Sequence, residues 1–136
     1  MSDKKESTDC TGYVFDELCM WHEAGSMRWT RWVEPGQPWE NPDTKRRFHN
    51  LLSVTGMLEN MKQIKARCAT KDEVLRFHTE EYINSVKDKS DKDGGNAGVT
   101  DEEHVKFAKR GYEIALLSAG GVLAMGKIFC FYMVLN

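Results

Sequence analysis

The side chains best suited to metal or acid–base chemistry are scattered along this sequence. The histidines are widely spaced: His22, His49, His78 and His104. The cysteines are equally dispersed: Cys10, Cys19, Cys68 and Cys130. No HxH, HxxxH, HExxH or CxxC pattern occurs, and closely spaced pairs of that kind supply most zinc sites. The sequence therefore predicts no metal site built from this chain alone, and no catalytic residue.

Composition is typical of a globular protein. The 136 residues are 40% hydrophobic and carry a formal net charge of −2, so neither direct nucleic-acid binding nor binding to an acidic membrane surface is expected. The start, MSDKKESTD, lacks the apolar segment of a signal peptide, and no apolar run reaches the roughly 20 residues of a membrane span. We therefore expect reduced thiols and a cytoplasmic or nuclear location.

The first part of the chain predicts a short strand, an aromatic loop and a helix. Residues 1–10 are polar and expected to be disordered, and 11–17 (TGYVFDE) is a β-type run. All four tryptophans fall within 21–39, where prolines and glycines predict a long structured loop. A helix is predicted over 41–56, because Asn41 can cap it and a proline follows. Its apolar stripe is predicted to comprise Phe48, Leu51, Leu52 and Thr55.

The middle of the chain predicts an edge-like strand and two helices. MKQIKAR (61–67) alternates weakly. Thr70 and Glu73 form a capping-box pattern, which predicts a helix there. Thr79 is predicted to cap a further short helix. Its inward residues would be Tyr82, Ile83 and Val86.

The last part predicts a loop followed by a helix. A polar loop is expected over 87–100 and a helix over 101–125, in which Gly120 and Gly121 indicate close helix packing. The order of elements suggests an α/β layer fold, yet two short strands make too small a sheet. We therefore expect a helix-rich part of a larger α/β fold.

Four blocks of the sequence carry a resemblance to a known family. In order they are TGYVFDELCMWHEAG, ENPDTKRRFHNLLSVTGML, IKARCATKDEVLRFHTEEYINSVK, and GGNAG followed by YEIALLSAGGVL. Together, over residues 11–125, they resemble the N-terminal region of histone deacetylase-like amidohydrolases. The nearest group is the class II and bacterial type, which includes the acetylpolyamine amidohydrolases.

The resemblance implies an arginase-like α/β fold with a parallel sheet and a narrow tunnel that leads to a zinc ion. Members of the family remove acyl groups from lysine side chains or polyamines, and a homo-oligomer is a further expectation. Asp and His residues hold the zinc, neighbouring histidines act as general base and acid, and a tyrosine polarises the acyl carbonyl. The chemistry is Lewis-acid activation of water with stabilisation of an oxyanion.

None of these groups is found here, because the sequence contains neither HH nor Asp-x-His. We therefore predict a truncated zinc-dependent deacetylase that lacks the zinc and catalytic residues and is inactive alone. The alternative is a non-catalytic binding or regulatory protein that pairs with a full-length homologue. An active enzyme that uses a cysteine or an Asp/Glu pair has no supporting constellation.

Asn96, within GGNAG, is the one substrate-binding residue that the resemblance suggests. Bacterial members usually carry Asp at this position, where it lies at the tunnel rim and accepts hydrogen bonds from substrate. Asn keeps one acceptor but loses the charge. A Gly/Asn turn in a solvated loop is the alternative interpretation. His22 and His78 are interpreted as structural.

At Gly126 the sequence leaves the family pattern and continues as an apolar run, Ile128 to Leu135. The resemblance implies that the preceding helix continues past Met125. Because Gly-Lys can be encoded by a splice-donor sequence, we expect 126–136 to be an off-family tail from translated intron or a frameshift. A buried strand of a parallel sheet is the alternative.

Overall fold

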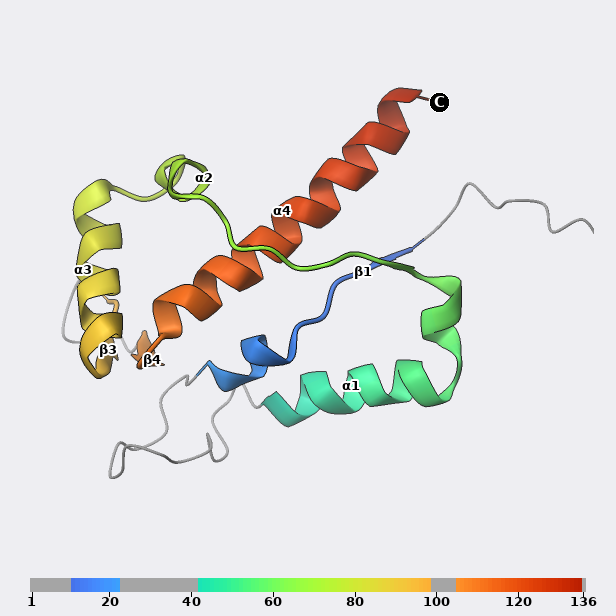
Figure 1. Ribbon diagram of the computed structural model, residues 1–136, viewed down its shortest axis with the longest axis horizontal. Helices are drawn as coiled ribbons and strands as arrows, with labels where there is room; N and C mark the ends of the chain where they lie inside the picture. The colour runs from blue at the N-terminus through green and yellow to red at the C-terminus, as the bar shows by residue number, and fades with distance from the viewer. Residues whose placement is uncertain (1–10, 23–41, 99–104, 136) are drawn as a thin grey trace, which may run out of the picture.

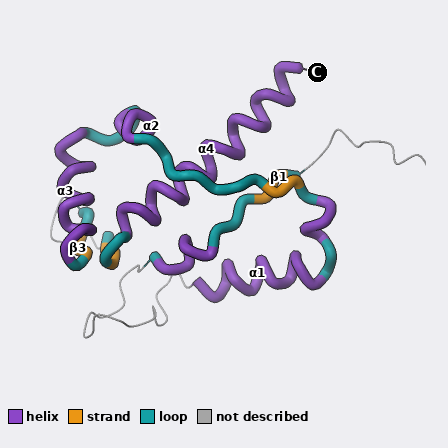
Figure 2. The backbone as a smooth tube through the Cα atoms, viewed as in Figure 1, coloured by secondary structure: helices purple, strands orange, loops and turns teal. Residues whose placement is uncertain are grey.

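The computed structural model describes residues 11–22, 42–98 and 105–135 (Figure 1). Helices make up most of it, and the strands are short (Figure 2). The elements in chain order are β1 (Gly12–Tyr13), the 3-10 helix η1 (Glu17–Trp21), α1 (Pro42–Val54), the 3-10 helix η2 (Met57–Asn60), β2 (Lys62–Gln63), α2 (Lys71–Leu75), α3 (Glu80–Lys92), β3 (Gly94–Asn96), β4 (Lys106–Ala108) and α4 (Gly111–Leu135). The predictions for residues 1–10 and for most of the tryptophan loop lie outside the described residues.

The strands form two small sheets. β1 and β2 pair in parallel, with Gly12 opposite Lys62 and Tyr13 opposite Gln63. The backbone N–H of Ile64 donates to the carbonyl of Tyr13 at 2.9 Å. β3 and β4 form an antiparallel hairpin. The helix-rich α/β class is confirmed, and β2 lies in the segment predicted as an edge strand.

Helix α1 forms where the sequence predicts it. Pro42 occupies its first turn, and Gly56, with φ of 72°, takes the left-handed conformation in which the chain turns into η2. The predicted apolar stripe lies along α1, but only part of it is buried. Leu52 is 4% exposed, whereas Phe48 and Leu51 are 58% and 56% exposed. The periodicity identified the apolar side of the helix, but little of the described chain covers it.

Helices α2 and α3 begin as predicted, each at a threonine. The Oγ1 of Thr70 accepts from the N–H of Glu73 at 3.2 Å, and the Glu73 carboxylate accepts from the N–H of Thr70 at 2.9 Å. This is a complete capping box. Thr79 caps α3 through the N–H of Tyr82 at 3.3 Å. Ile83 is buried, and Tyr82 and Val86 are half-buried, so the inward face of α3 is also confirmed.

The loop predicted over 87–100 and the helix start at 101 are both wrong. α3 continues to Lys92, the β3–β4 hairpin follows, and α4 begins at Gly111. Two contacts to Ser90 fix this start: its carbonyl accepts from the N–H of Arg110 at 3.2 Å, and its Oγ accepts from the N–H of Tyr112 at 3.1 Å. Pairing across the hairpin, with Phe107 buried beneath it, replaces the helical turns that the polar pattern suggested.

Helix α4 packs closely on an extended segment. An ideal Cβ on Gly120 would lie 1.9 Å from the carbonyl oxygen of Arg67, and the N–H of Ala69 donates to the carbonyl of Leu116 at 2.8 Å. The glycines therefore mark close packing as predicted, but the partner is an extended chain and not another helix. Only a residue without a side chain allows this approach.

The apolar run Ile128 to Leu135 belongs to α4. The strand interpretation of this run is therefore wrong, and the expected continuation of the helix past Met125 is confirmed. Figure 1 shows the second half of α4 extending away from the other elements. Among the described residues, no helix combines the length and apolar character that a membrane span requires. The division into 11–125 and 126–136 stays a prediction.

Candidate functional site

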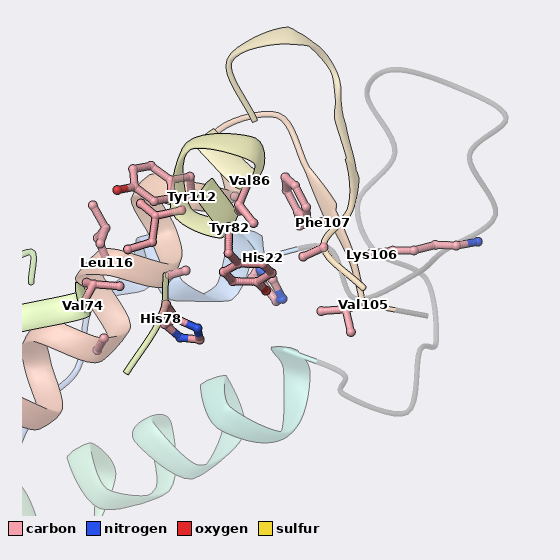
Figure 3. Close-up of a pocket in the computed structure, with 15 residues that line it drawn as sticks. His22, Val74, His78, Tyr82, Val86, Val105, Lys106, Phe107, Tyr112 and Leu116 are labelled. Carbon is pink, nitrogen blue, oxygen red and sulfur yellow. The ribbon is translucent and has the colours of Figure 1, made fainter. Parts of the chain in front are cut away.

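A cavity of about 340 Å³ lies between α3, the β3–β4 hairpin and the start of α4. In Figure 3 the labelled lining residues come from these elements, from α2 and the turn after it, and from the end of η1. Its wall is mostly apolar and includes Ile83, Val86, Phe107 and Leu116. The inward face of α3 and the packing of the hairpin bring these residues together.

A few polar side chains also line the cavity. The rings of His78 and Tyr82 stack with centroids 5.1 Å apart, and Phe77 meets His78 edge-on at 5.0 Å. His22, which directly follows η1, is part of the same wall. In Figure 3 the side chain of Lys106 points away from these rings. The structural interpretation of His78 fits its place in an aromatic stack, whereas the position of His22 at the cavity was not anticipated.

The described ranges are 11–22, 42–98 and 105–135, and a metal site would need several His, Cys, Asp or Glu side chains there to lie together. In these ranges no three His, Cys, Asp or Glu side chains come together in a way that could hold a metal ion.

The structure places Asn96 at the end of β3, at the loop end of the β3–β4 hairpin. Its Oδ1 accepts from the backbone N–H groups of Gly98 and Val105, each at 3.0 Å. Its own carbonyl accepts from Nζ of Lys89 at 2.8 Å. The Asn96 side-chain oxygen, to which the family resemblance assigns a role in substrate binding, therefore stabilises the hairpin here. The role of Asn96 at a substrate rim stays a prediction.

A second aromatic cluster joins α1 to the first strand. Oη of Tyr13 and Nδ1 of His49 are 2.8 Å apart, and the rings of Phe15 and His49 stack at 3.9 Å. Burial raises the pKa of Tyr13 above its usual value. No sequence pattern predicted a role for His49. The alternation of Tyr13 and Phe15 along one side of the strand was the available signal.

An ion pair lies at the corner formed by residues 67–73, where the chain enters α2. The guanidinium of Arg67 donates to both carboxylate oxygens of Glu73, each at 2.7 Å, and the Glu73 side chain is 14% exposed. These bonds, with the one from the N–H of Thr70, hold the pKa of Glu73 well below its usual range. Nζ of Lys127 on α4 lies 3.5 Å from the same carboxylate. The capping box was visible in the sequence, but the arginine partner was not.

The half-buried Cys19 shows no sign of activation. Cys19 and Cys68 are free thiols. Burial raises the pKa of Cys19, and the nearby Asp16 and Cys68 add to this effect. A thiol that is kept protonated is a poor nucleophile. Cys19 therefore gives no support to the interpretation of the chain as a cysteine-dependent enzyme.

Comparison with known proteins gives consistent matches. Residues 38–130 match the family model of the histone deacetylase domain. The chain is 38% identical over 122 residues to a histone deacetylase-like amidohydrolase of Pseudomonas aeruginosa. It is 28% identical over 103 residues to the polyamine deacetylase HDAC10 of Danio rerio. The crystal structure of the HDA15 HD domain superposes with a TM-score of 0.61 at 27% identity.

These matches cover most of this chain but a small part of each relative. The alignment with the P. aeruginosa protein spans 84% of this chain and 31% of the relative. The corresponding shares for HDAC10 are 69% and 14%, and those for the HDA15 domain are 85% and 30%. The resemblance deduced from the four sequence blocks is confirmed.

Proposed function

Because the chain belongs to the histone deacetylase family, we propose that it forms the N-terminal scaffold of a zinc-dependent amide hydrolase. The substrate class is an acetylated lysine side chain or an acetylated polyamine. The observation that carries the proposal is the 38% identity to an amidohydrolase, which extends over 84% of this chain. The expected location is the cytoplasm or the nucleus, where free thiols such as Cys19 and Cys68 stay reduced.

We propose further that the 136 residues do not contain the zinc ligands or the catalytic groups. Two observations support this: no HH or Asp-x-His occurs in the sequence, and the described residues contain no cluster that could hold a metal. What these residues supply is the packed framework of α3, the hairpin and α4 beside the cavity. The chain alone is then expected to be catalytically inactive.

The test compares two proteins for zinc content and for hydrolysis of an acetyl-lysine peptide and an acetylated polyamine. The first is the chain alone. The second is a fusion in which residues 11–125 replace the matching part of the P. aeruginosa relative. We expect about one zinc per molecule and amide hydrolysis for the fusion only. Zinc binding or hydrolysis by the chain alone would contradict the missing-site proposal, and an inactive, zinc-loaded fusion would contradict the scaffold proposal.

A second function is a non-catalytic partner that pairs with a homologue. The specific observation in its favour is the exposed apolar side of α1, where Phe48 and Leu51 are uncovered by the described chain. Capture of a full-length relative by this chain, with a change in the activity of that relative, would support this function over the first.

A further inference from the structure

We propose that the cavity between α3, the β3–β4 hairpin and α4 binds a small, uncharged aromatic molecule that carries an O–H or N–H donor. This inference goes beyond the proposed function, because neither zinc nor amide hydrolysis enters it. The cavity volume of about 340 Å³ lies in the lower part of the roughly 300–1,000 Å³ range of small-molecule sites. The ligand is therefore expected to have one or two rings.

The walls of the cavity are held in place by hydrogen bonds of the chain itself. Oγ of Ser90 on α3 accepts from the N–H of Tyr112 at 3.1 Å and so fixes the start of α4. Nζ of Lys89, also on α3, donates to the carbonyl of Asn96 in the hairpin at 2.8 Å. A site that is already formed pays a smaller ordering cost when a ligand binds. The cavity has this property because all three of its walls are joined through α3.

The cavity is formed without the parallel strand pair. Within the described residues, its lining includes none from α1, β1 or β2. Figure 1 shows α3 and the hairpin toward the opposite end of the described chain from β1. The shape of the cavity therefore depends on α3, the hairpin and α4, and not on the exposed side of α1.

Most of the wall is apolar and suits a flat ring. Its apolar side chains include Val74, Ile83, Phe107 and Leu116. Ile83 and Phe107 are 3% and 5% exposed, so they form a closed floor. An aromatic molecule gains free energy by removing its apolar faces from water and by ring contacts with a side chain such as Phe107.

The lining disfavours a charged ligand. No Asp or Glu is among the described residues that line the cavity, so a cation would find no carboxylate partner there. Lys106 is the only Lys or Arg of this lining, and Figure 3 shows its side chain pointing away from the aromatic rings. Burying a charge without a partner is costly. The expected ligand is therefore neutral, unlike a polyamine, whose amines are protonated at neutral pH.

The histidine of the aromatic stack supplies a hydrogen-bonding group. The rings of His78 and Tyr82 lie 5.1 Å apart with 23° between their planes. Within the part of the chain that the structure describes, no hydrogen bond engages the ring nitrogens of His78. A neutral imidazole has one acceptor nitrogen. A ligand O–H or N–H can donate to this nitrogen while the ligand rings lie against the apolar wall.

The experiment titrates the isotope-labelled 136-residue chain with indole and records amide chemical shifts by NMR. We expect saturable shifts at the amides of Ile83, Ala97 and Val105, which line the cavity, with a dissociation constant on the order of 1 mM or below. Absence of saturable shifts at these amides overturns the proposal.

Three analogues of indole test the chemical class of the ligand. 1-Methylindole lacks the N–H donor and should bind about 3–10-fold more weakly. Tryptamine is a cation and indole-3-acetate is an anion, and each should bind about 10-fold more weakly or worse. Equal or tighter binding of a charged analogue overturns the assignment of a neutral ligand. Equal binding of 1-methylindole overturns the donor requirement.

Two substitutions on α4 locate the ligand. Ala115 lines the cavity and is exposed, so Ala115→Phe should fold normally, place a ring in the cavity and weaken indole binding about 10-fold or more. Ser118→Phe is the matched control, because it adds the same ring at an exposed position of the same helix that does not line the cavity. Circular dichroism checks the folding of both variants. Equal indole affinity of the two variants overturns the assignment of this cavity.

His78→Phe tests the hydrogen bond separately from packing. The substitution keeps a ring beside Tyr82 but removes both ring nitrogens. Indole should then bind no better than 1-methylindole, whereas the affinity for 1-methylindole should stay the same. A substitution that only disturbs packing would weaken both probes equally, and that result overturns the role of His78 as the acceptor.

Discussion

Around α3 and the β3–β4 hairpin, most apolar side chains are covered and the buried polar groups that the structure describes are paired, whereas α1 presents apolar side chains to solvent. Phe107 is 5% exposed beneath the hairpin, and Phe48 on α1 is 58% exposed. Ser90 is fully buried and uses both its hydroxyl and its carbonyl at the start of α4. The groups of the hairpin region find their partners within the described chain. The α1 region has the pattern of a buried helix but lacks most of the cover.

The largest expected effect comes from removing the same side chain in each region. Phe107→Ala should lower the free energy of unfolding by about 3–5 kcal/mol, because it empties a packed site. Phe48→Ala should cost less than about 1 kcal/mol, since most of that ring already contacts water. Urea unfolding followed by circular dichroism measures both. Equal losses would show that the α1 region is as well packed as the hairpin and would remove the contrast.

The contact between α4 and the segment around Arg67 is the next place to test. Gly120→Ala should destabilise the chain by about 3 kcal/mol, because the new Cβ would overlap the Arg67 carbonyl unless the backbone moves. Gly126→Ala in the same helix is the matched control, with no atom within 4 Å of its Cβ. This control should gain up to about 1 kcal/mol from helix propensity. If both variants gain stability, α4 does not pack on this segment.

A smaller loss is expected at Ser90. Ser90→Ala removes the buried acceptor for the N–H of Tyr112, and a buried donor without a partner costs about 1–2 kcal/mol. Ser85→Ala, at an exposed position of the same helix, should be neutral or slightly stabilising. Hydrogen exchange at the Tyr112 amide gives a local readout, and protection there should fall in Ser90→Ala alone. Unchanged exchange would mean that the hydroxyl contributes little to the start of α4.

What the sequence could predict differs between the regions for physical reasons. Local signals were sufficient for α1, for the Thr70–Glu73 capping box and for the Thr79 cap, because each depends on residues within a few positions. The β3–β4 hairpin was missed, because it depends on pairing between Gly94–Asn96 and Lys106–Ala108 and not on local propensity.

The candidate site shows the same limit. Asn96 could be singled out from a resemblance, but its hydrogen bond from the N–H of Val105 across the hairpin depends on a register that the sequence did not reveal. The polar ring of His22 reaches the cavity from a segment far away in the chain. The exposed state of Phe48 was equally unpredictable, since periodicity identifies the apolar side of a helix and not whether anything covers it.

The smallest expected effect concerns the Arg67–Glu73 pair and depends on pH. The pKa of Glu73 is lowered in the folded chain, so the ionised carboxylate stabilises the fold above its unfolded pKa, near 4.5, and this contribution is lost as pH falls below that value. Glu73→Gln should therefore be less stable than the unaltered chain at pH 7. This difference in stability should shrink as the pH falls below about 4.5.

A double-mutant cycle with Arg67→Gln isolates the pair from the rest of the corner. The coupling measured at pH 7 should weaken at acid pH and in high salt, because the charges are then neutralised or screened. A coupling near zero would show that Glu73 acts mainly through its capping bond from the N–H of Thr70. In that case the corner would owe its order to local backbone capping, and the contrast between the satisfied hairpin region and the uncovered α1 would be one of packing alone.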